Sequence, residues 1–295
     1  MILDSTFFLK GFIYFLDAFC LATLLAAVLV FTLRRFYFDS KKRVVYIDGK
    51  RAKTVGFFHP YANSCGGGEK VLWCAVQALQ EIAEFQPIHC VIYTGDTCSS
   101  EEILETTKRI LHIDIKPSFH LEFVRLSKRT WLEAFHYPHF TMLFQSLASM
   151  LVMLESLSQF IPDLLVDTTG LAFTYPVVKL FTSSRILSYT HYPTISTDML
   201  HRVIHRETQF NNDAFITSHP ILSLLKQFYY RVFAVFYGLA GRCADLVLAN
   251  GSWTYNHLVS LWRQPHTLRR LSALRHHRAS NARIPKLVKH DAKRQ

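Results

Sequence analysis

The sequence predicts an α/β protein, a Rossmann-like parallel sheet covered by helices on both faces and preceded by one transmembrane helix. The sheet is indicated by short apolar runs that alternate with helical patterns from Lys53 onward. Strands that alternate with helices in this way are typical of parallel sheets buried on both faces. The anchor is indicated by residues 18–33, which contain no charged side chain.

The apolar run near the N-terminus is long enough to cross a membrane. Extended back to Gly11 it covers 23 residues with one interruption, Asp17, which is roughly 30 Å of helix and about the thickness of a bilayer core. A cleaved signal peptide is the alternative. The residues before the run are acidic on balance, and Arg34-Arg35 follows at once in place of a small-residue cleavage site. We therefore expect an uncleaved anchor within residues 1–35.

The flanking charges predict how the anchor is oriented. Residues 34–43 carry five basic side chains and one acidic side chain, and the positive-inside rule places such a segment in the cytosol. The N-terminus would then lie in the lumen, and residues 36–52 would form a basic cytosolic linker. Six Cys without a CxxC pair agree with a reducing compartment for the rest of the chain.

The body of the chain, residues 53–262, has the pattern of one α/β domain. Helices are expected at 68–83, where apolar residues recur at helical spacing, and from Ser99 to about Leu111. In a parallel sheet, ligands bind outside the carboxyl ends of the strands. We therefore expect a site lined by 59–69, 94–97, 167–170, 190–194 and 249–252. The expected strands are 55–60, 90–95, 121–126, 164–170, 185–193 and 244–251.

Two stretches are unusually apolar. Residues 138–160 contain one charged side chain, Glu155, and we favour a helix that faces the core. Residues 219–240 mix Lys226 and Arg231 with six aromatic side chains. For this second stretch a core helix is the alternative, but interspersed cations and aromatic rings favour a helix in the membrane interface.

The net charge of +11 belongs almost entirely to the last 33 residues. Residues 263–295 carry a net charge of +9, whereas residues 1–262 carry +2. This tail has no aromatic side chain for base stacking, so we expect no nucleic-acid partner and a disordered tail with weak attraction to anionic headgroups. A composition of 50% hydrophobic and 14% aromatic residues excludes disorder for most of the chain.

The clearest local motif is HPYANSCGGGEK, residues 59–70. An expected strand runs into three glycines, Gly66, Gly67 and Gly68, which open an expected helix. Glycines let backbone N–H groups approach a ligand, and a helix N-terminus favours anionic oxygens, so a diphosphate would fit. The spacing is neither that of a Walker loop nor GxGxxG. A tight strand-to-helix turn without a ligand remains the alternative.

The second motif is SYTHYPTISTDML, residues 188–200. His191 follows an expected strand among hydroxyl groups, where it could contact a sugar or a phosphate, or serve as a structural histidine. The pairs His136/His139 and His201/His205 have spacings that a metal could use, but no acidic or Cys partner accompanies them, so no metal is expected. No GxSxG hydrolase motif is present.

These blocks together resemble one family. It comprises the cytosol-facing, dolichol-linked oligosaccharide α-1,2-mannosyltransferases of the N-glycan pathway, which use GDP-mannose and have a retaining GT-B fold. The resemblance runs from about Val55 to Trp262, and the GGGE and HYPTISTDML blocks make it specific. It rests on FFHPYANSCGGGEKVLW (57–73), YTGD (93–96), YPHFT (137–141), SYTHYPTISTDML (188–200), FNN (210–212), YGL (237–239) and NGSWTYNHLVSLW (250–262).

The resemblance implies roles for individual residues. Gly66, Gly67 and Gly68 match the family's glycine loop, and Glu69 matches its acid. Lys70 stands where Arg is usual, and Cys65 where a further Gly is usual. His191 matches the family's His-Tyr-Pro and would contact the transferred sugar. Substrate contacts are also expected from the residues that follow it, which are Tyr192, Ser196, Thr197 and Asp198.

The resemblance also implies a location and partners. The enzyme would sit in the endoplasmic reticulum membrane as a single-pass protein with a cytosolic catalytic domain. Its partners would be a dolichyl-diphosphate oligosaccharide, membrane lipids and other glycosyltransferases of the pathway, with no cofactor beyond the donor GDP-mannose. Because the resemblance stops at Trp262, we expect the N-terminal half of a GT-B fold, without the donor-binding domain and with little or no activity. A non-catalytic, membrane-bound module that binds the acceptor or other enzymes is the alternative function.

Overall fold

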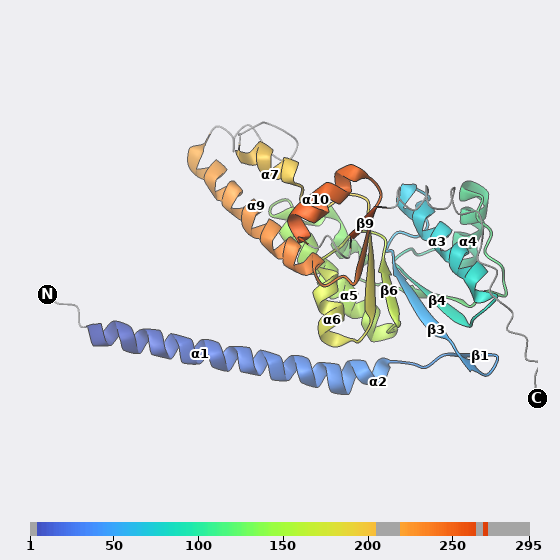
Figure 1. Cartoon of the computed structure of the whole chain (residues 1–295), viewed down its shortest axis with the longest axis horizontal. Coiled ribbons are helices and arrows are strands. Elements are labelled where there is room, and N and C mark those ends of the chain that lie inside the picture. The colour runs from blue at the N-terminus through green and yellow to red at the C-terminus, as the bar shows by residue number, and fades with distance from the viewer. Residues whose placement is uncertain (1–4, 205–218, 264–267, 271–295) are drawn as a thin grey trace, which may run out of the picture.

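A seven-stranded, fully parallel sheet forms the centre of the molecule (Figure 1). The computed structural model describes residues 5–204, 219–263 and 268–270. The strand order is β5-β4-β3-β6-β7-β8-β9, so the chain reverses its direction of growth across the sheet between β5 and β6. The strands are β3 (Lys53–Phe58), β4 (Ile88–Thr94), β5 (Leu121–Arg125), β6 (Leu164–Asp167), β7 (Arg185–Thr190), β8 (Leu246–Ala249) and β9 (Leu268–Arg270).

The predicted α/β fold is confirmed, with strands that end earlier than expected. The pattern 164–170 predicts a strand to Gly170, but β6 ends at Asp167. Asp167 accepts hydrogen bonds from the backbone N–H groups of Thr169 and Gly170 at 2.8 and 3.1 Å, which turns the chain out of the sheet. Likewise β7 ends at Thr190, directly before His191. These early ends leave polar residues free to line the carboxyl edge.

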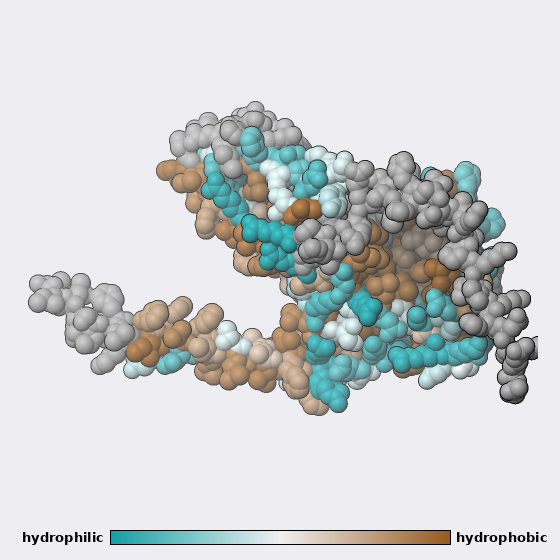
Figure 2. All heavy atoms as spheres, viewed as in Figure 1, coloured by the Kyte–Doolittle hydropathy of each residue, from teal (hydrophilic) through white to brown (hydrophobic). Residues whose placement is uncertain are grey.

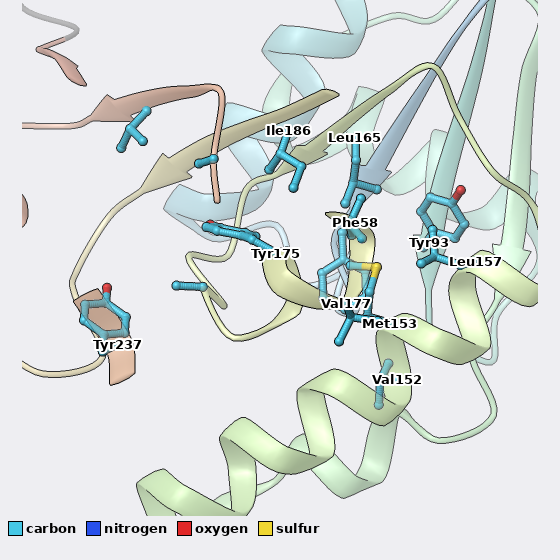
Figure 3. Close-up of a cluster of buried hydrophobic side chains, with 14 of the residues drawn as sticks. Phe58, Tyr93, Val152, Met153, Leu157, Leu165, Tyr175, Val177, Ile186 and Tyr237 are labelled. Atoms are coloured by element: carbon cyan, nitrogen blue, oxygen red, sulfur yellow. The ribbon is translucent and has the colours of Figure 1, made fainter. Parts of the chain in front are cut away.

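Successive side chains of a strand point to opposite faces of the sheet and belong to two separate cores. Phe57 belongs to the core beneath helices α3 (Gly67–Ala83) and α4 (Ser100–Thr106). Its neighbour Phe58 points to the opposite face, as the two-residue period of a strand requires. Figure 3 shows this second core, where Val152 and Met153 of α5 (Thr141–Gln159) lie near Phe58 and Leu165. The sheet is therefore buried on both faces.

The remaining helical segments complete the layers around the sheet. The second core includes residues from η1, α5, α6, α9 and α10, so these elements cover one face. Ser99 caps α4 by accepting a hydrogen bond from the N–H of Glu102 at 3.1 Å, as predicted. The further segments are η2 (Thr107–Leu111), η3 (Arg129–Leu132), η4 (Ala134–His136), α6 (Thr174–Phe181), α7 (Thr197–Ile204), α9 (Pro220–Gly241) and α10 (Ser252–Trp262).

The N-terminal apolar run forms one long helix that extends away from the domain (Figure 1). Helix α1 (Ser5–Thr32) continues through the π-helical segment η1 (Leu33–Phe38) into α2 (Asp39–Lys41). Within the segment Phe12–Lys41, an 18-residue window has a mean hydropathy of 2.3, and none of that window is buried in the protein. Phe38 joins it to the domain through a ring contact of 4.9 Å with Phe181 of α6. By length and composition this helix can cross a membrane.

The segment predicted as a linker, residues 36–52, is more structured than expected. It contains the end of the long helix and a small antiparallel hairpin of β1 (Tyr46–Ile47) and β2 (Lys50–Arg51). The turn is Asp48-Gly49, with φ of 50° and 73°. Positive φ at both positions is what a two-residue hairpin turn requires, and Asp-Gly is a favoured pair for it. The sequence signal for this hairpin was present and was overlooked.

Helices α5 and α9 each bury one side and expose apolar side chains on the other. The prediction of a core helix at 138–160 is confirmed for one face of α5, which contributes Val152, Met153 and Leu157 to the second core. Helix α9 buries Tyr230, Phe233 and Tyr237. Large apolar side chains that stay exposed are Leu143, Phe144, Leu147 and Leu151 of α5, and Ile221, Leu222, Leu224, Leu225, Phe228, Val232, Val235, Phe236 and Leu239 of α9. Figure 2 shows brown surface over α1 and along α9.

The basic tail contributes one strand that was not expected. Residues 268–270 form β9, which pairs in parallel with β8, so the prediction of a tail without strands is wrong for these three residues. Without β9, the backbone of β8 would form an open edge of the sheet, and a strand of almost any composition can pair there. The FNN block, His205 and residues 271–295 lie outside the described residues.

Candidate functional site

The carboxyl ends of β3, β6 and β7 bring two histidines to the glycine loop. His59 directly follows β3, and His191 directly follows β7. A Cβ atom added to Gly68 would lie 3.7 Å from Nε2 of His191 and 3.7 Å from Cε1 of His59. The two imidazoles therefore flank the backbone of Gly68, and the absence of a side chain there keeps the space between them open. We refer to this arrangement as the histidine–glycine site.

The glycine loop forms the start of helix α3. Cys65 adopts a left-handed conformation with φ of 55°, and Gly66 is the N-cap residue. The N–H of Gly66 donates to Oε2 of Glu69 at 2.7 Å. One N–H group at this helix start is thus already bound to a carboxylate of the same chain. No side-chain atom or other heavy atom outside the loop lies within 4 Å of a Cβ placed on Gly67, so the loop is open at that residue.

His59 links three elements of the site. Its ring is 2% exposed. Nδ1 lies 2.6 Å from Oγ1 of Thr168, just after β6, and Nε2 lies 3.2 Å from Oε1 of Glu69 in α3. The hydrogen bond from His59 is the main reason that the pKa of Glu69 lies below its ordinary value. Glu69 is therefore ionised at neutral pH and acts only as an acceptor.

His191 keeps an unused nitrogen at the same place. Nε2 of His191 is buried and has no hydrogen-bond partner among the described residues. Burial, followed by the charge of His59, lowers the pKa of His191 below its usual 6.5, so the ring is neutral at neutral pH. Its backbone oxygen accepts a hydrogen bond of 2.9 Å from Oγ1 of Thr254 in α10, which fixes the position of the residue. A neutral imidazole with a free nitrogen suits a hydroxyl group better than an anion.

A buried polar network supports the site from below. Asp167 is fully buried, and its Oδ2 accepts a hydrogen bond of 2.6 Å from the hydroxyl of Tyr175. That hydroxyl also lies 2.7 Å from Oγ of Ser188 in β7. Burial raises the pKa of Asp167 in spite of its several donors. The network joins β6, β7 and α6, and it sets the turn that presents Thr168 to His59.

The segment after His191 is engaged with helix α10. Oγ1 of Thr197 lies 2.5 Å from Nδ1 of His257. Oδ2 of Asp198 accepts from Nε1 of Trp253 at 3.1 Å and lies 3.4 Å from Nε2 of His257. Ser196 is fully buried and accepts from the N–H of Met199 at 3.2 Å, at the start of α7. Thr197 and Asp198 thus hold α7 against α10, and Ser196 caps the start of α7.

Two predicted residues lie at the rim of the site. Tyr192 is 59% exposed and stacks on the ring of Trp253 at 4.8 Å between centroids. Lys70 is exposed at the start of α3, and its backbone N–H donates to the oxygen of Gly66 at 3.0 Å. Both side chains remain accessible to a ligand. The structure therefore brings the three glycines, Glu69 and His191 together, and leaves Tyr192 and Lys70 beside them.

The carboxyl end of β4 is closed by an ion pair. Asp96 accepts from the N–H of Asn63 at 2.9 Å and lies 3.3 Å from Nη1 of Arg129. The guanidinium of Arg129 stacks over the ring of Tyr61 at 4.9 Å. Burial and a hydrogen bond to Glu133 raise the pKa of Tyr61 to about 12. The expected site range 94–97 thus forms a side wall of the loop.

Sequence reasoning assigned no role to His59 or to Thr168. Both lie in ranges that were expected to line the site, because each follows a strand at its carboxyl end. That position was the only signal in the sequence, and the pairing of residues 109 positions apart follows from the adjacency of β3 and β6. Among the described residues, no group of three or more His, Cys, Asp or Glu side chains could hold a metal ion.

Comparisons with known proteins point to one family. The family model described as "ALG11 mannosyltransferase N-terminus" matches residues 52–262. The chain is 46% identical to the GDP-Man:Man(3)GlcNAc(2)-PP-Dol alpha-1,2-mannosyltransferase of Mus musculus over 79% of this chain and 47% of that protein. It is 44% identical to the protein of the same name from Xenopus laevis, over 80% of this chain and 48% of that protein. The chain thus spans about half the length of these relatives.

Solved structures are matched more remotely. A UDP-glucosyltransferase from Polygonum tinctorium aligns with a TM-score of 0.36 at 11% identity, over 74% of this chain and 51% of that chain. A likeness this weak carries no argument about the present protein.

Proposed function

Because the chain belongs to the ALG11 mannosyltransferase N-terminal family, we propose that it takes part in α-1,2-mannosyl transfer from GDP-mannose to a dolichyl-diphosphate-linked oligosaccharide. The acceptor would be the Man(3)GlcNAc(2) lipid that gives the relatives their name. In this proposal residues 53–262 form the N-terminal half of a GT-B fold and hold the acceptor. The reaction takes place on the cytosolic face of the endoplasmic reticulum.

The histidine–glycine site is the observation that carries this proposal. It combines an ionised carboxylate, a neutral imidazole with a free nitrogen and an open glycine backbone at the carboxyl edge of a parallel sheet. Ligands of such sheets bind at this edge. A sugar offers hydroxyl groups that can donate to Glu69 and exchange hydrogen bonds with His191.

The charges near the glycine loop favour different positions for the sugar and for the diphosphate of the acceptor. Glu69 already caps Gly66, and a second anion beside its carboxylate would be repelled. We therefore place the sugar hydroxyls next to Glu69 and His191. The diphosphate would lie farther out, near Lys70 and the open backbone of Gly67, with Tyr192 at the rim. Ser196, Thr197 and Asp198 would act indirectly, by holding α7 on α10. No metal is required in this proposal.

The membrane would present the acceptor to the site. We propose that α1 spans the bilayer once, with the basic residues 34–43 on the cytosolic side, and that the exposed apolar side of α9 lies in the interface. Helix α9 and segment η1 both pack on α6, so the anchor and α9 belong to the same layer of the domain. Lys226 and Arg231 on α9 suit the headgroup region. Contacts with other glycosyltransferases of the pathway remain an expectation from the family.

A binding and transfer assay tests the function. The 295-residue chain is placed in phospholipid nanodiscs with a synthetic polyprenyl-diphosphate-linked Man(3)GlcNAc(2). Acceptor binding and transfer of radiolabelled mannose from GDP-mannose are then measured, with and without EDTA. We expect saturable acceptor binding that EDTA does not change, and about tenfold weaker binding for His191→Ala, the loss expected for one hydrogen bond in a buried site. His120→Ala is the matched control, because His120 is an exposed histidine directly before β5, at the amino end of the strand and away from the site.

The outcomes separate the two functions. Binding together with mannose transfer supports the enzyme, whereas binding without transfer supports the non-catalytic acceptor-binding module. No acceptor binding, or equal binding by wild type and His191→Ala, would contradict the proposed site. Loss of activity with EDTA would contradict the expectation that no metal is used.

An environment-sensitive probe tests the interface helix. The probe is attached to a cysteine introduced at Leu225 of α9, which is 59% exposed, and in a second variant at Glu81 of α3, an exposed polar position. If α9 lies in the interface, the emission at position 225 shifts to the blue in nanodiscs and that at position 81 does not. Equal, water-like emission at both positions would place α9 in solvent.

A further inference from the structure

His59 occupies a position that the proposed function does not explain. Its ring is buried beside Gly68 of the loop, and both of its nitrogens are already bonded within the protein. It joins the turn after β6, through Thr168, to the first turn of α3, through Glu69. Glu69 in turn uses its other carboxylate oxygen to hold the N–H of Gly66 at 2.7 Å. A chain of hydrogen bonds thus runs from the sheet to the glycine loop.

We propose that His59 is the positioning residue of the glycine loop, and that it holds Glu69 in the one orientation that caps Gly66. The relevance of this role to catalysis rests on the proposed function, but the clamp itself is a property of this chain. Without a donor at Nε2 of His59, nothing else among the described side chains is bonded to Oε1 of Glu69. The carboxylate would then be held only by the backbone N–H groups of Gly66 and of Glu69 itself, and the Gly66 cap would open more often.

The protonation of the clamp follows from its partners. An ionised Glu69 can only accept, so Nε2 of His59 carries the proton and donates to it. Nδ1 of the same ring lies 2.6 Å from Oγ1 of Thr168, a hydroxyl that can donate to an unprotonated Nδ1 or accept from a protonated one. Thr168 is held by the turn that Asp167 closes through Thr169 and Gly170. Thr168 thereby holds the ring of His59 in the orientation that points Nε2 at Glu69.

Two substitutions at position 59 separate the two ends of the clamp. Asn reaches about as far as Nδ1, so the carbonyl oxygen of His59→Asn can still accept from Thr168 but cannot reach Glu69. Gln reaches about as far as Nε2, so the amide of His59→Gln can still donate to Glu69. The measurement is residue-resolved hydrogen exchange of the Gly66 amide in the full chain in nanodiscs, since local opening sets this rate.

The clamp predicts opposite results for the two variants. His59→Asn should speed exchange at Gly66 about tenfold, the effect expected for one lost hydrogen bond to a charged group. His59→Gln should stay within about threefold of wild type. Amides of β4 and β6 serve as internal controls and should be unchanged in both. The proposal would be overturned if Gly66 exchanged at the wild-type rate in His59→Asn while the strands stayed intact. It would also be overturned if exchange at Gly66 were equally fast in both variants.

Substitutions of Thr168 test whether its hydroxyl orients the ring of His59, and they serve if position 59 does not tolerate change. Thr168→Val removes the hydroxyl at nearly constant volume and should speed exchange at Gly66 by about threefold to tenfold, whereas Thr168→Ser should restore the wild-type rate. Equal rates in Thr168→Val and wild type would overturn the role of Thr168. None of these readouts depends on mannose transfer, so failure of the proposed function and failure of the clamp are distinguishable. If both hold, acceptor binding should fall in His59→Asn and recover in His59→Gln.

Discussion

The two sequence motifs of this chain look equally functional but end in different environments. At the glycine loop, the polar groups converge on an open space, and Nε2 of His191 remains without a partner among the described residues. In the segment 196–198, Thr197 and Asp198 bond to side chains of α10, and Ser196 accepts from the N–H of Met199 in α7. The comparison indicates that residue type alone identifies a polar site. Polar atoms that remain without a hydrogen-bond partner are what identify a ligand site.

The physical basis of this difference is where each segment leaves the sheet. The glycine loop and His191 both follow a strand at its carboxyl end, where the neighbouring strand β6 also stops. Residues 196–198 begin α7, and the first turn of a helix needs partners for its free N–H groups. Ser196 supplies one such partner to Met199. A serine at that place is therefore explained without any substrate.

Replacing Glu69 should have the largest effect on both stability and binding. Glu69→Ala removes the partner of His59 and the cap of Gly66, two hydrogen bonds to one partly buried carboxylate, and should lower the free energy of unfolding by about 2 kcal/mol. Acceptor binding should fall at least as much as in His191→Ala. Denaturant unfolding in micelles and the nanodisc binding assay measure the two effects. An Ala variant with unchanged Gly66 exchange and unchanged binding would remove the distinction between the motifs.

Replacing Asp198 should affect stability without affecting binding. Asp198→Ala loses the hydrogen bond to Trp253 and the contact with His257 on a half-exposed surface, and should cost about 1 kcal/mol. Asp198→Asn keeps an acceptor for Trp253 and should recover most of this loss. Both variants are compared by the same unfolding and binding measurements. Weaker acceptor binding in a stable Asp198→Asn protein would show that this carboxylate contacts the ligand after all.

Replacing Cys65 should stabilise the glycine loop slightly. Cys65 has φ of 55°, a left-handed conformation that a side chain disfavours. Cys65→Gly should raise the free energy of unfolding by about 0.5 kcal/mol, because the relief of strain exceeds the added entropy of the unfolded glycine. Cys65→Ser keeps the strain and should show no gain. A destabilised Gly variant would mean that the thiol packs more favourably than its backbone conformation indicates.

The pH dependence of stability should show the smallest effect, with a sign set by His191 and Glu69. Both groups have a pKa below the ordinary value in the folded state, His191 through burial and Glu69 through the hydrogen bond from His59. The stability that these two groups contribute is fully present above their pKa in the unfolded state. It is lost as the pH falls through their pKa in the folded state. Unfolding should therefore become easier below about pH 6.5, the usual value for histidine. The slope should be shallower in His191→Gln, and an identical slope would contradict a buried, neutral His191.

Much of the fold could be predicted because its signals are local. The apolar run 18–33, the helix after Gly66 and the strand before His59 each follow from spacing and charge within about twenty residues. The Asp48-Gly49 hairpin was equally local and could have been predicted. Strand β9 could not be predicted, because residues 268–270 form a strand only by pairing with the otherwise open edge of β8.

The sequence predicted where the candidate site lies, but not which of its side chains are bonded to one another. Sequence alone placed Gly66, Glu69 and His191 at the carboxyl edge of a parallel sheet, since the pattern of strands determines which residues follow them. Only the tertiary structure decided that His59 and Thr168 meet, and that Asp198 turns to α10. Those pairings depend on which strands are neighbours and on which helix covers a turn. These contacts join residues that are far apart in the sequence. They form because the burial of two apolar cores brings the strands and helices together, and no local pattern in the chain encodes them.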